Sequence, residues 1–203
     1  TYGNTKEDPA FSEGAPYTLP AKELEAGRVP EKIPENYDIA KGNFVVFDIE
    51  TTGFSSDRDR IIEIGAVKYE SGKETGQFSE FINPEIPIPY RITNLTSITD
   101  EMVMGAETVS GILPKFAEFC KGCVLVGHNV QFDISFIKKN SRDLGLPDYY
   151  TTVDTMDMAR ILLPGHKSYN LDAVGKMLNV VNPHHHRAVD DARTTAWIFE
   201  KLI

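Results

Sequence analysis

The chain has 203 residues, of which 41% are hydrophobic and 25% charged, a composition typical of a folded domain of ordinary size with a shorter additional segment. Its formal net charge of −9 argues against a protein whose whole surface coats nucleic acid, because such binding depends on Lys and Arg neutralising phosphates. The net charge does not exclude a nucleic-acid enzyme whose active site is acidic because it holds metal cations. No apolar run approaches the roughly 20 residues of a membrane span, and the first residues lack a signal-peptide pattern, so we expect a cytoplasmic protein with no membrane partner.

The first 42 residues differ in composition from the rest of the chain. They are rich in Pro, Glu, Lys and Gly and show no sustained hydrophobic periodicity; the prolines are Pro9, Pro16, Pro20, Pro30 and Pro34. We expect residues 1–42 to be an extended arm or linker, in which residues 21–26 could form one short helix.

From residue 43 the pattern becomes regular and predicts an α/β domain at 43–203. Three strands come first, and the turn signal Ser71-Gly72 separates the second from the third. Helices and strands then alternate, and three further helical stretches follow to Ile203, which favours a mixed sheet flanked by helices. The predicted strands are 44–49, 61–69, 77–82, 123–126 and 151–154, and the predicted helices between them are 108–121 and 130–144.

The stretch VVFDIETTG, residues 45–53, places two acids at the end of an apolar strand. Side chains alternate along a strand, so Asp48 and Glu50 project from the same face. Two adjacent carboxylates repel each other unless a proton or cation neutralises them, and their oxygens suit Mg²⁺ or Mn²⁺. The alternative is a solvated strand end.

A third acid, Asp133, occurs in GHNVQFD, residues 127–133, where a short strand leads into a helix. Asp133 shares a helix face with Ile137, so it points inward or along the edge of the core. The alternative is an acid placed favourably near a helix N-terminus.

The stretch HHHRAVDDA, residues 184–192, begins the last helix and holds two aspartates. At about 100° per residue, Ala192 lies at the centre of the apolar face and Asp191 at its border. Asp190 lies about 160° from Ala192, on the solvent side with Trp197 and Lys201. The projection therefore selects Asp191, and not Asp190, for a site at the edge of the core.

His186 precedes Asp191 by five residues and has an ordinary pKa of about 6.5, so it could accept a proton from water near neutral pH. The alternative is a run of surface histidines; a zinc site made only of these adjacent histidines is disfavoured by geometry. Cys120 and Cys123 form one C-x-x-C motif, which is typical of a redox pair or half of a zinc site. With no second such motif in the chain, the alternative of two small buried apolar residues is favoured.

Together these motifs resemble the DnaQ-like, or DEDDh, family of 3′–5′ exonucleases over residues 43–203. The matching residues are Asp48 and Glu50 in D-x-E-T-T-G, Asp133 in H-N-x-x-F-D, and His186 with Asp191 in H-x-x-x-x-D. Within the family, the chain is most similar to the proofreading exonuclease domain of PolC-type DNA polymerase III, and next to the separate epsilon proofreading subunit. The resemblance implies an RNase H-like fold with a five-stranded mixed sheet.

The resemblance also implies a mechanism, in which Asp48, Glu50, Asp133 and Asp191 hold two Mg²⁺ or Mn²⁺ ions and His186 removes a proton from the attacking water. The product is a nucleoside 5′-monophosphate released from a 3′ end of DNA. The implied partner is a DNA polymerase subunit or the remainder of a larger polymerase chain. An RNA-trimming exonuclease of the same superfamily and a catalytically idle binding module are the alternatives; a redox protein built on the two cysteines is the weakest.

Substrate contacts are implied next to these residues. Thr51, Thr52 and Gly53 follow the first motif and are expected beside the terminal nucleotide. Leu95 and Phe132 are candidates for packing on its base or sugar, or else belong to the core. We expect Glu63 to be structural and Asp154 to support the ligands from behind.

Overall fold

The computed structural model describes residues 42–180 and 187–203 of the chain. The arm predicted for residues 1–42, apart from its last residue, and the histidines at 184–186 lie outside the described residues, so the domain boundary stays a prediction. None of the helices in the described ranges is both long and apolar enough to span a membrane.

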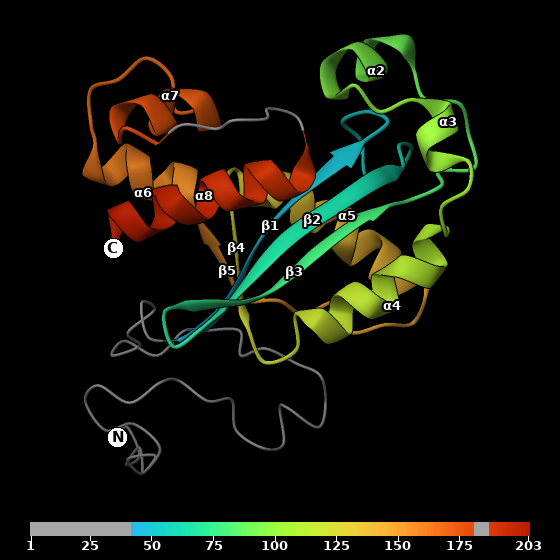
Figure 1. Cartoon of the computed structure of the whole chain (residues 1–203), viewed down its shortest axis with the longest axis horizontal. Helices are drawn as coiled ribbons and strands as arrows, with labels where there is room; N and C mark the ends of the chain where they lie inside the picture. Colours follow the sequence, from blue (N-terminus) through green and yellow to red (C-terminus); the bar gives the residue numbers. More distant parts are fainter. Residues whose placement is uncertain (1–41, 181–186) are drawn as a thin grey trace, which may run out of the picture.

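Five strands form one mixed sheet in the order β3-β2-β1-β4-β5 (Figure 1). Neighbours are antiparallel from β3 to β1 and parallel from β1 to β5. The α/β class and the five-stranded mixed sheet expected from the sequence are confirmed. The strands are β1 Asn43–Thr51, β2 Ile61–Glu70, β3 Lys73–Phe81, β4 Val124–Gly127 and β5 Thr152–Asp154.

The helices cover both faces of the sheet. Figure 1 shows α4 and α5 on one side, and α8 lying along β1 and β2 on the other, with α6 and α7 beside it. The helices are α2 Tyr90–Thr96, α3 Asp100–Val103, α4 Val109–Phe119, α5 Val130–Asp143, α6 Thr155–Leu162, α7 Leu171–Met177 and α8 Ala188–Leu202.

Several element boundaries differ from the sequence-based expectation. The third strand begins at Lys73 instead of Gln77 and ends at Phe81, because its first half is a polar edge segment without the apolar alternation that marks a strand. The predicted turn is confirmed: Ser71 and Gly72 both have positive φ (52° and 74°), the conformation of a tight two-residue hairpin. Helices α2 and α3 were not predicted, because they are too short to show a helical period.

Alternation along β1 divides the core into two layers. Val45, Phe47 and Ile49 pack with the apolar side chains of α4 and α5. Phe44 and Val46 point the other way and pack in a cluster that includes the α8 side chains of Ala196 and Phe199. Because the alternation continues, Asp48 and Glu50 project toward the α8 face.

The start of α8 lies directly on β2 at Gly65. A Cβ built at Gly65 would come within 2.0 Å of the backbone nitrogen of Val189 and 2.2 Å of the carbonyl carbon of Ala188. Gly65 pairs with Asp48 across the β1–β2 ladder. The absent side chain therefore lets the first turn of α8 approach the sheet beside the two acids of β1.

This contact makes Gly65 sensitive to the smallest substitution. We expect Gly65→Ala to lower the free energy of unfolding by about 1–3 kcal/mol or more, because the added methyl group meets backbone atoms that cannot rotate away. The measurement is urea unfolding. Gly105→Ala is the matched control, since nothing lies within 4 Å of a Cβ at that position, and should change stability by less than about 0.5 kcal/mol. Equal effects of the two substitutions would contradict the close-approach account.

Candidate active site

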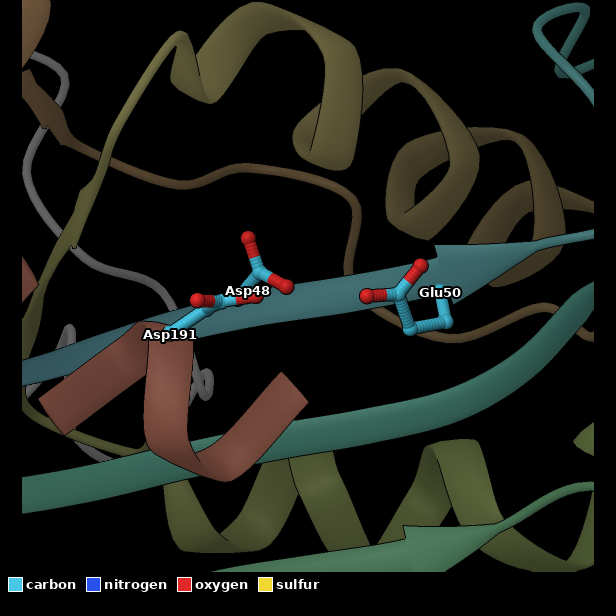
Figure 2. Close-up of side chains that lie close together, drawn as sticks. All are labelled: Asp48, Glu50 and Asp191. Carbon is cyan, nitrogen blue, oxygen red and sulfur yellow. The ribbon is translucent and has the colours of Figure 1, made fainter. Parts of the chain in front are cut away.

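Three carboxylates meet where the end of β1 faces the first turn of α8. One carboxylate oxygen from each of Asp48, Glu50 and Asp191 lies within 4.8 Å of the others. Figure 2 shows the three side chains together, two from the strand and one from the helix. Asp191 is 8% exposed and belongs to this group, whereas Asp190 does not, as the helical projection predicted. Asp190 is half-buried and not fully on the solvent side as expected.

Asp133 approaches the same site from α5. It is 3% exposed, and its Oδ1 accepts a hydrogen bond of 3.1 Å from the backbone N–H of Ile49, the residue between Asp48 and Glu50. The inward orientation expected for Asp133 is therefore confirmed. The group of three with mutual distances within 4.8 Å does not include Asp133, although all four acids line one pocket of about 290 Å³.

Burial and mutual repulsion make this cluster costly to ionise. Burial, followed by the charges of neighbouring acids with Asp133 first, raises the pKa of Asp48 well above its usual value. Burial and the charges of Asp191 and Glu63 raise the pKa of Glu50 to about 8. Burial likewise raises the pKa of Asp133 to about 8, against the lowering effect of its hydrogen bond from Ile49. Such a site holds protons near neutral pH unless cations replace them.

A fifth acid, Glu63 on β2, lies beside this cluster, and both of its carboxylate oxygens accept hydrogen bonds from the start of α8. Its carboxylate is 1% exposed and accepts hydrogen bonds from Arg187 and from the backbone N–H of Ala188 (3.1 Å). The structural role expected for Glu63 is confirmed, and its partner is Arg187.

Asp154 holds the start of α5. Its carboxylate accepts hydrogen bonds from the backbone N–H groups of Asn129 and Val130, both 3.0 Å, and caps α6 by accepting from that of Met156 at 2.9 Å. Asn129 has φ 62° at the N-cap of α5, so this bond fixes a left-handed turn four residues before Asp133. Asp154 thus supports the site from behind.

One wall of the pocket was not predicted from the sequence. Besides the acids, the pocket is lined by Ile49, His128, Asn129, Phe132 and three residues at the start of α7, namely Asn170, Leu171 and Asp172. His128 joins the two walls: its Nδ1 lies 2.9 Å from Thr155 Oγ1 and its Nε2 lies 2.7 Å from the carbonyl oxygen of Tyr169. His128 belongs to the GHNVQFD stretch that was quoted for Asp133, so the sequence could have indicated its place in the site. No sequence pattern indicated that the start of α7 would line the pocket.

The residues expected to contact the substrate do not all line the pocket. Phe132 is half-buried in the pocket wall, and its ring centroid lies 6.3 Å from that of the exposed Phe54. Thr51, Thr52 and Gly53 are buried directly after Glu50 and are not among the residues lining this pocket, so their contact with a nucleotide stays a prediction. Thr51 Oγ1 donates to the carbonyl oxygen of Gly53 at 2.6 Å.

The remaining expected residues lie elsewhere. Leu95 is 47% exposed on α2 and is not among the residues lining this pocket. The two cysteines are buried free thiols within the core, and burial raises the pKa of Cys123 to about 11, which fits apolar packing and gives no support to a redox role. His186 lies outside the described residues, so its role stays a prediction.

Comparison with known proteins decides the family. The family model RNase_T, described as Exonuclease, matches residues 45–199, which contain all the residues of the pocket. The chain belongs to this exonuclease family.

The relatives of this exonuclease domain include much longer proteins. DNA polymerase III PolC-type of Caldanaerobacter subterraneus subsp. tengcongensis is 47% identical over 184 residues, which cover 89% of this chain and 13% of that protein. The PolC-type protein of Clostridium perfringens is 52% identical over 157 residues, 77% of this chain and 11% of that protein. The chain therefore spans only about an eighth of the length of these relatives. The first alignment is longer than the predicted 43–203 domain, so it also includes part of residues 1–42.

Solved structures agree with this family. Exonuclease X in complex with 5′ overhanging duplex DNA has a TM-score of 0.61 and 28% identity, covering 78% of this chain and 90% of that chain. E. coli exonuclease I in complex with a dA16 oligonucleotide has a TM-score of 0.69 and 18% identity, covering 79% of this chain and 40% of that chain, a likeness of fold.

The raised pKa of Glu50 predicts a pH-dependent stability without metal. The folded state holds this proton more tightly than the unfolded state, so the contribution to stability is complete below pH 4.5 and is lost as the pH rises through about 8. Glu50→Gln is neutral throughout. We therefore expect the variant to gain stability relative to the wild type between pH 5 and pH 9, by on the order of a few kcal/mol.

The measurement is urea unfolding in EDTA at pH 5, 7 and 9. Glu80→Gln, at an exposed glutamate of β3, is the control and should show no such trend. A stability difference for Glu50→Gln that stays constant across this pH range would contradict the electrostatic account of the cluster.

Proposed function

We propose that this domain is a metal-dependent 3′–5′ exonuclease that shortens DNA from its 3′ end and releases nucleoside 5′-monophosphates. The observation that carries the proposal is the convergence of three carboxylates from β1 and α8, with one oxygen from each within 4.8 Å of the others, in an open pocket. The family match supports the reaction class.

The donor set fits divalent cations with a preference for oxygen. Carboxylates of Asp48, Glu50 and Asp191 form the group, with Asp133 beside it, and no His or Cys belongs to the group among the described residues. Mg²⁺ and Mn²⁺ prefer such ligands, and two of them would balance four carboxylates. When bound, the cations would lower the pKa of a water molecule and offset the charge that develops on the phosphodiester.

The side chains of the domain then have separate tasks. The four carboxylates hold and space the cations, and the bond from Ile49 fixes Asp133 against β1. His186, five residues before Asp191, takes the proton of the attacking water. Phe132 in the pocket wall packs against the terminal base or sugar, and residues 51–53, which follow Glu50 in the chain, are proposed to lie beside the same nucleotide.

Proofreading of newly made DNA is the role that the relatives favour. The proteins that are 47% and 52% identical are PolC-type DNA polymerases III, and the domain corresponds to a small part of each. The 28% identical exonuclease X was solved with duplex DNA carrying a 5′ overhang. We therefore propose that the domain works as part of a larger polymerase chain or with a polymerase subunit, and that it prefers a mismatched DNA 3′ end to an RNA end.

The two adjacent aspartates of α8 provide a matched test. We expect Asp191→Asn to lower kcat more than about 100-fold, because changes behind metal ligands already cost about 10–100-fold. Asp190→Asn, one position away and outside the carboxylate group, should stay within about threefold of the wild type. The assay is shortening of a 5′-labelled DNA strand in Mg²⁺, with EDTA as the blank. Digestion that persists in EDTA, or equal losses in the two variants, would rule out the proposed metal site.

The general base is tested within the histidine run. We expect His186→Ala to lower kcat by about 10²–10⁴-fold, the loss typical of a missing general base, with Mn²⁺ affinity nearly unchanged. His184→Ala is the control and should remain close to wild type. If His184→Ala causes the larger loss, the base has been assigned to the wrong histidine.

A further inference from the structure

Glu63 is an acid beside the carboxylate group whose contacts the proposed chemistry does not use. It pairs directly with Glu50 across the β1–β2 ladder, so both side chains project from the same face. Its charge contributes to raising the pKa of Glu50 and of Asp48. A buried carboxylate in this position would add to the repulsion in the cluster unless another group neutralised it.

Arg187 provides that neutralisation from the residue that precedes α8. Its Nη2 lies 2.8 Å and its Nε 3.1 Å from Oε1 of Glu63, and its guanidinium carbon lies 4.9 Å above the ring centroid of Phe81. The other carboxylate oxygen accepts from the backbone N–H of Ala188 at 3.1 Å. One carboxylate on β2 thus binds both the side chain and the backbone at the start of α8.

The same contact determines where Asp191 lies. The backbone N–H of Asp191 donates to the carbonyl oxygen of Arg187 at 3.0 Å, so the two residues are one helical turn apart. Gly65, two residues beyond Glu63, leaves room for this turn to lie on the sheet. A shift or rotation of the first turn would therefore move the Asp191 carboxylate away from Asp48 and Glu50.

We propose that Glu63 and Arg187 are a positioning pair that sets the first turn of α8 so that Asp191 completes the metal-holding group. The pair also engages the Arg187 guanidinium in hydrogen bonds with Glu63, so that these bonds do not occupy the carboxylate of Glu50. This inference rests on the proposed function, because it assigns the pair a part in assembling that site.

A second ion pair between α8 and the sheet provides a matched control. Arg193 bonds through Nη2 to Glu74 at 3.1 Å and to Gln77 at 2.8 Å, both on β3. Arg193→Met removes an arginine contact from the same helix to the same sheet, without touching the helix start. Because Glu63 is buried and Glu74 is exposed, losing the Arg187 pair is expected to cost more stability than losing the Arg193 pair. A pair that only added stability would nevertheless leave the Mn²⁺ affinity and kcat of the folded protein unchanged.

The experiment compares Arg187→Met, Arg187→Lys, Glu63→Gln and Arg193→Met in the 203-residue chain. Circular dichroism identifies the folded variants, calorimetry without DNA gives their Mn²⁺ dissociation constants, and strand shortening gives kcat and KM. We expect Arg187→Met and Glu63→Gln to weaken Mn²⁺ binding about 10-fold or more, the size of effect known for groups that orient metal ligands, and to lower kcat with little change in KM. Arg193→Met should change each quantity less than about threefold.

Arg187→Lys should fall between, because lysine keeps the charge but cannot donate from a planar fork. If Arg187→Met does not fold, Arg187→Lys and Glu63→Gln still test whether the pair positions Asp191. Wild-type Mn²⁺ affinity in the folded Glu63 and Arg187 variants, or losses equal to those of Arg193→Met, would overturn the inference. If the wild type binds Mn²⁺ but degrades no DNA, the proposed function fails, while the Mn²⁺ comparison still tests the positioning pair.

Discussion

The contact between the first turn of α8 and the sheet is the constraint on which the site depends. Asp48 and Glu50 are only two residues apart, and their strand alone brings them together, but Asp191 comes from more than 140 residues further along the chain. Gly65 allows the helix backbone to reach the sheet, and Glu63 binds the helix start through Arg187 and Ala188. Packing of Phe44 and Val46 against Phe199 then holds the rest of α8 in place. The relative positions of the acids therefore depend on how α8 packs on the sheet.

The electrostatic repulsion among these acids explains why the site is suited to binding divalent cations. Buried acids that repel one another hold their protons near neutral pH, as the raised pKa values of Glu50 and Asp133 indicate. Divalent cations relieve the same repulsion when they replace these protons, so cation binding releases protons and strengthens as the pH rises. Arg187 makes its hydrogen bonds to the fifth acid, Glu63, and so leaves the carboxylate oxygens of the other four acids to the cations. The net negative charge of the chain is compatible with binding DNA, because the part that meets the phosphate is proposed to hold those cations.

Local periodicity was sufficient to predict the residues that share a single element. Strand alternation placed Asp48 and Glu50 on one face, and helical projection separated Asp191 from Asp190, as the structure confirms. Local patterns alone do not predict contacts between distant elements, and the acids of β1, α5 and α8 were brought together only by the family resemblance. Glu63 and Arg187 are 124 positions apart, and nothing in either local pattern indicates their pairing. The same limit applies to Asn170, Leu171 and Asp172, which enter the pocket wall only because α7 packs there. The short helices α2 and α3 were missed for a different reason, since neither is long enough to show a period.

The central claim is that the convergent carboxylates are a cation site that acts on a DNA 3′ end, as expected for a domain of the exonuclease family. The most direct measurement is a crystal structure of the chain with Mn²⁺ and a nucleoside 5′-monophosphate, in which anomalous scattering locates the ions without assumption about their ligands. We expect anomalous peaks within coordination distance of Asp48, Glu50 and Asp191, with the phosphate of the nucleotide in the same pocket. Peaks only at exposed surface acids, with this carboxylate group binding no ion, would contradict it.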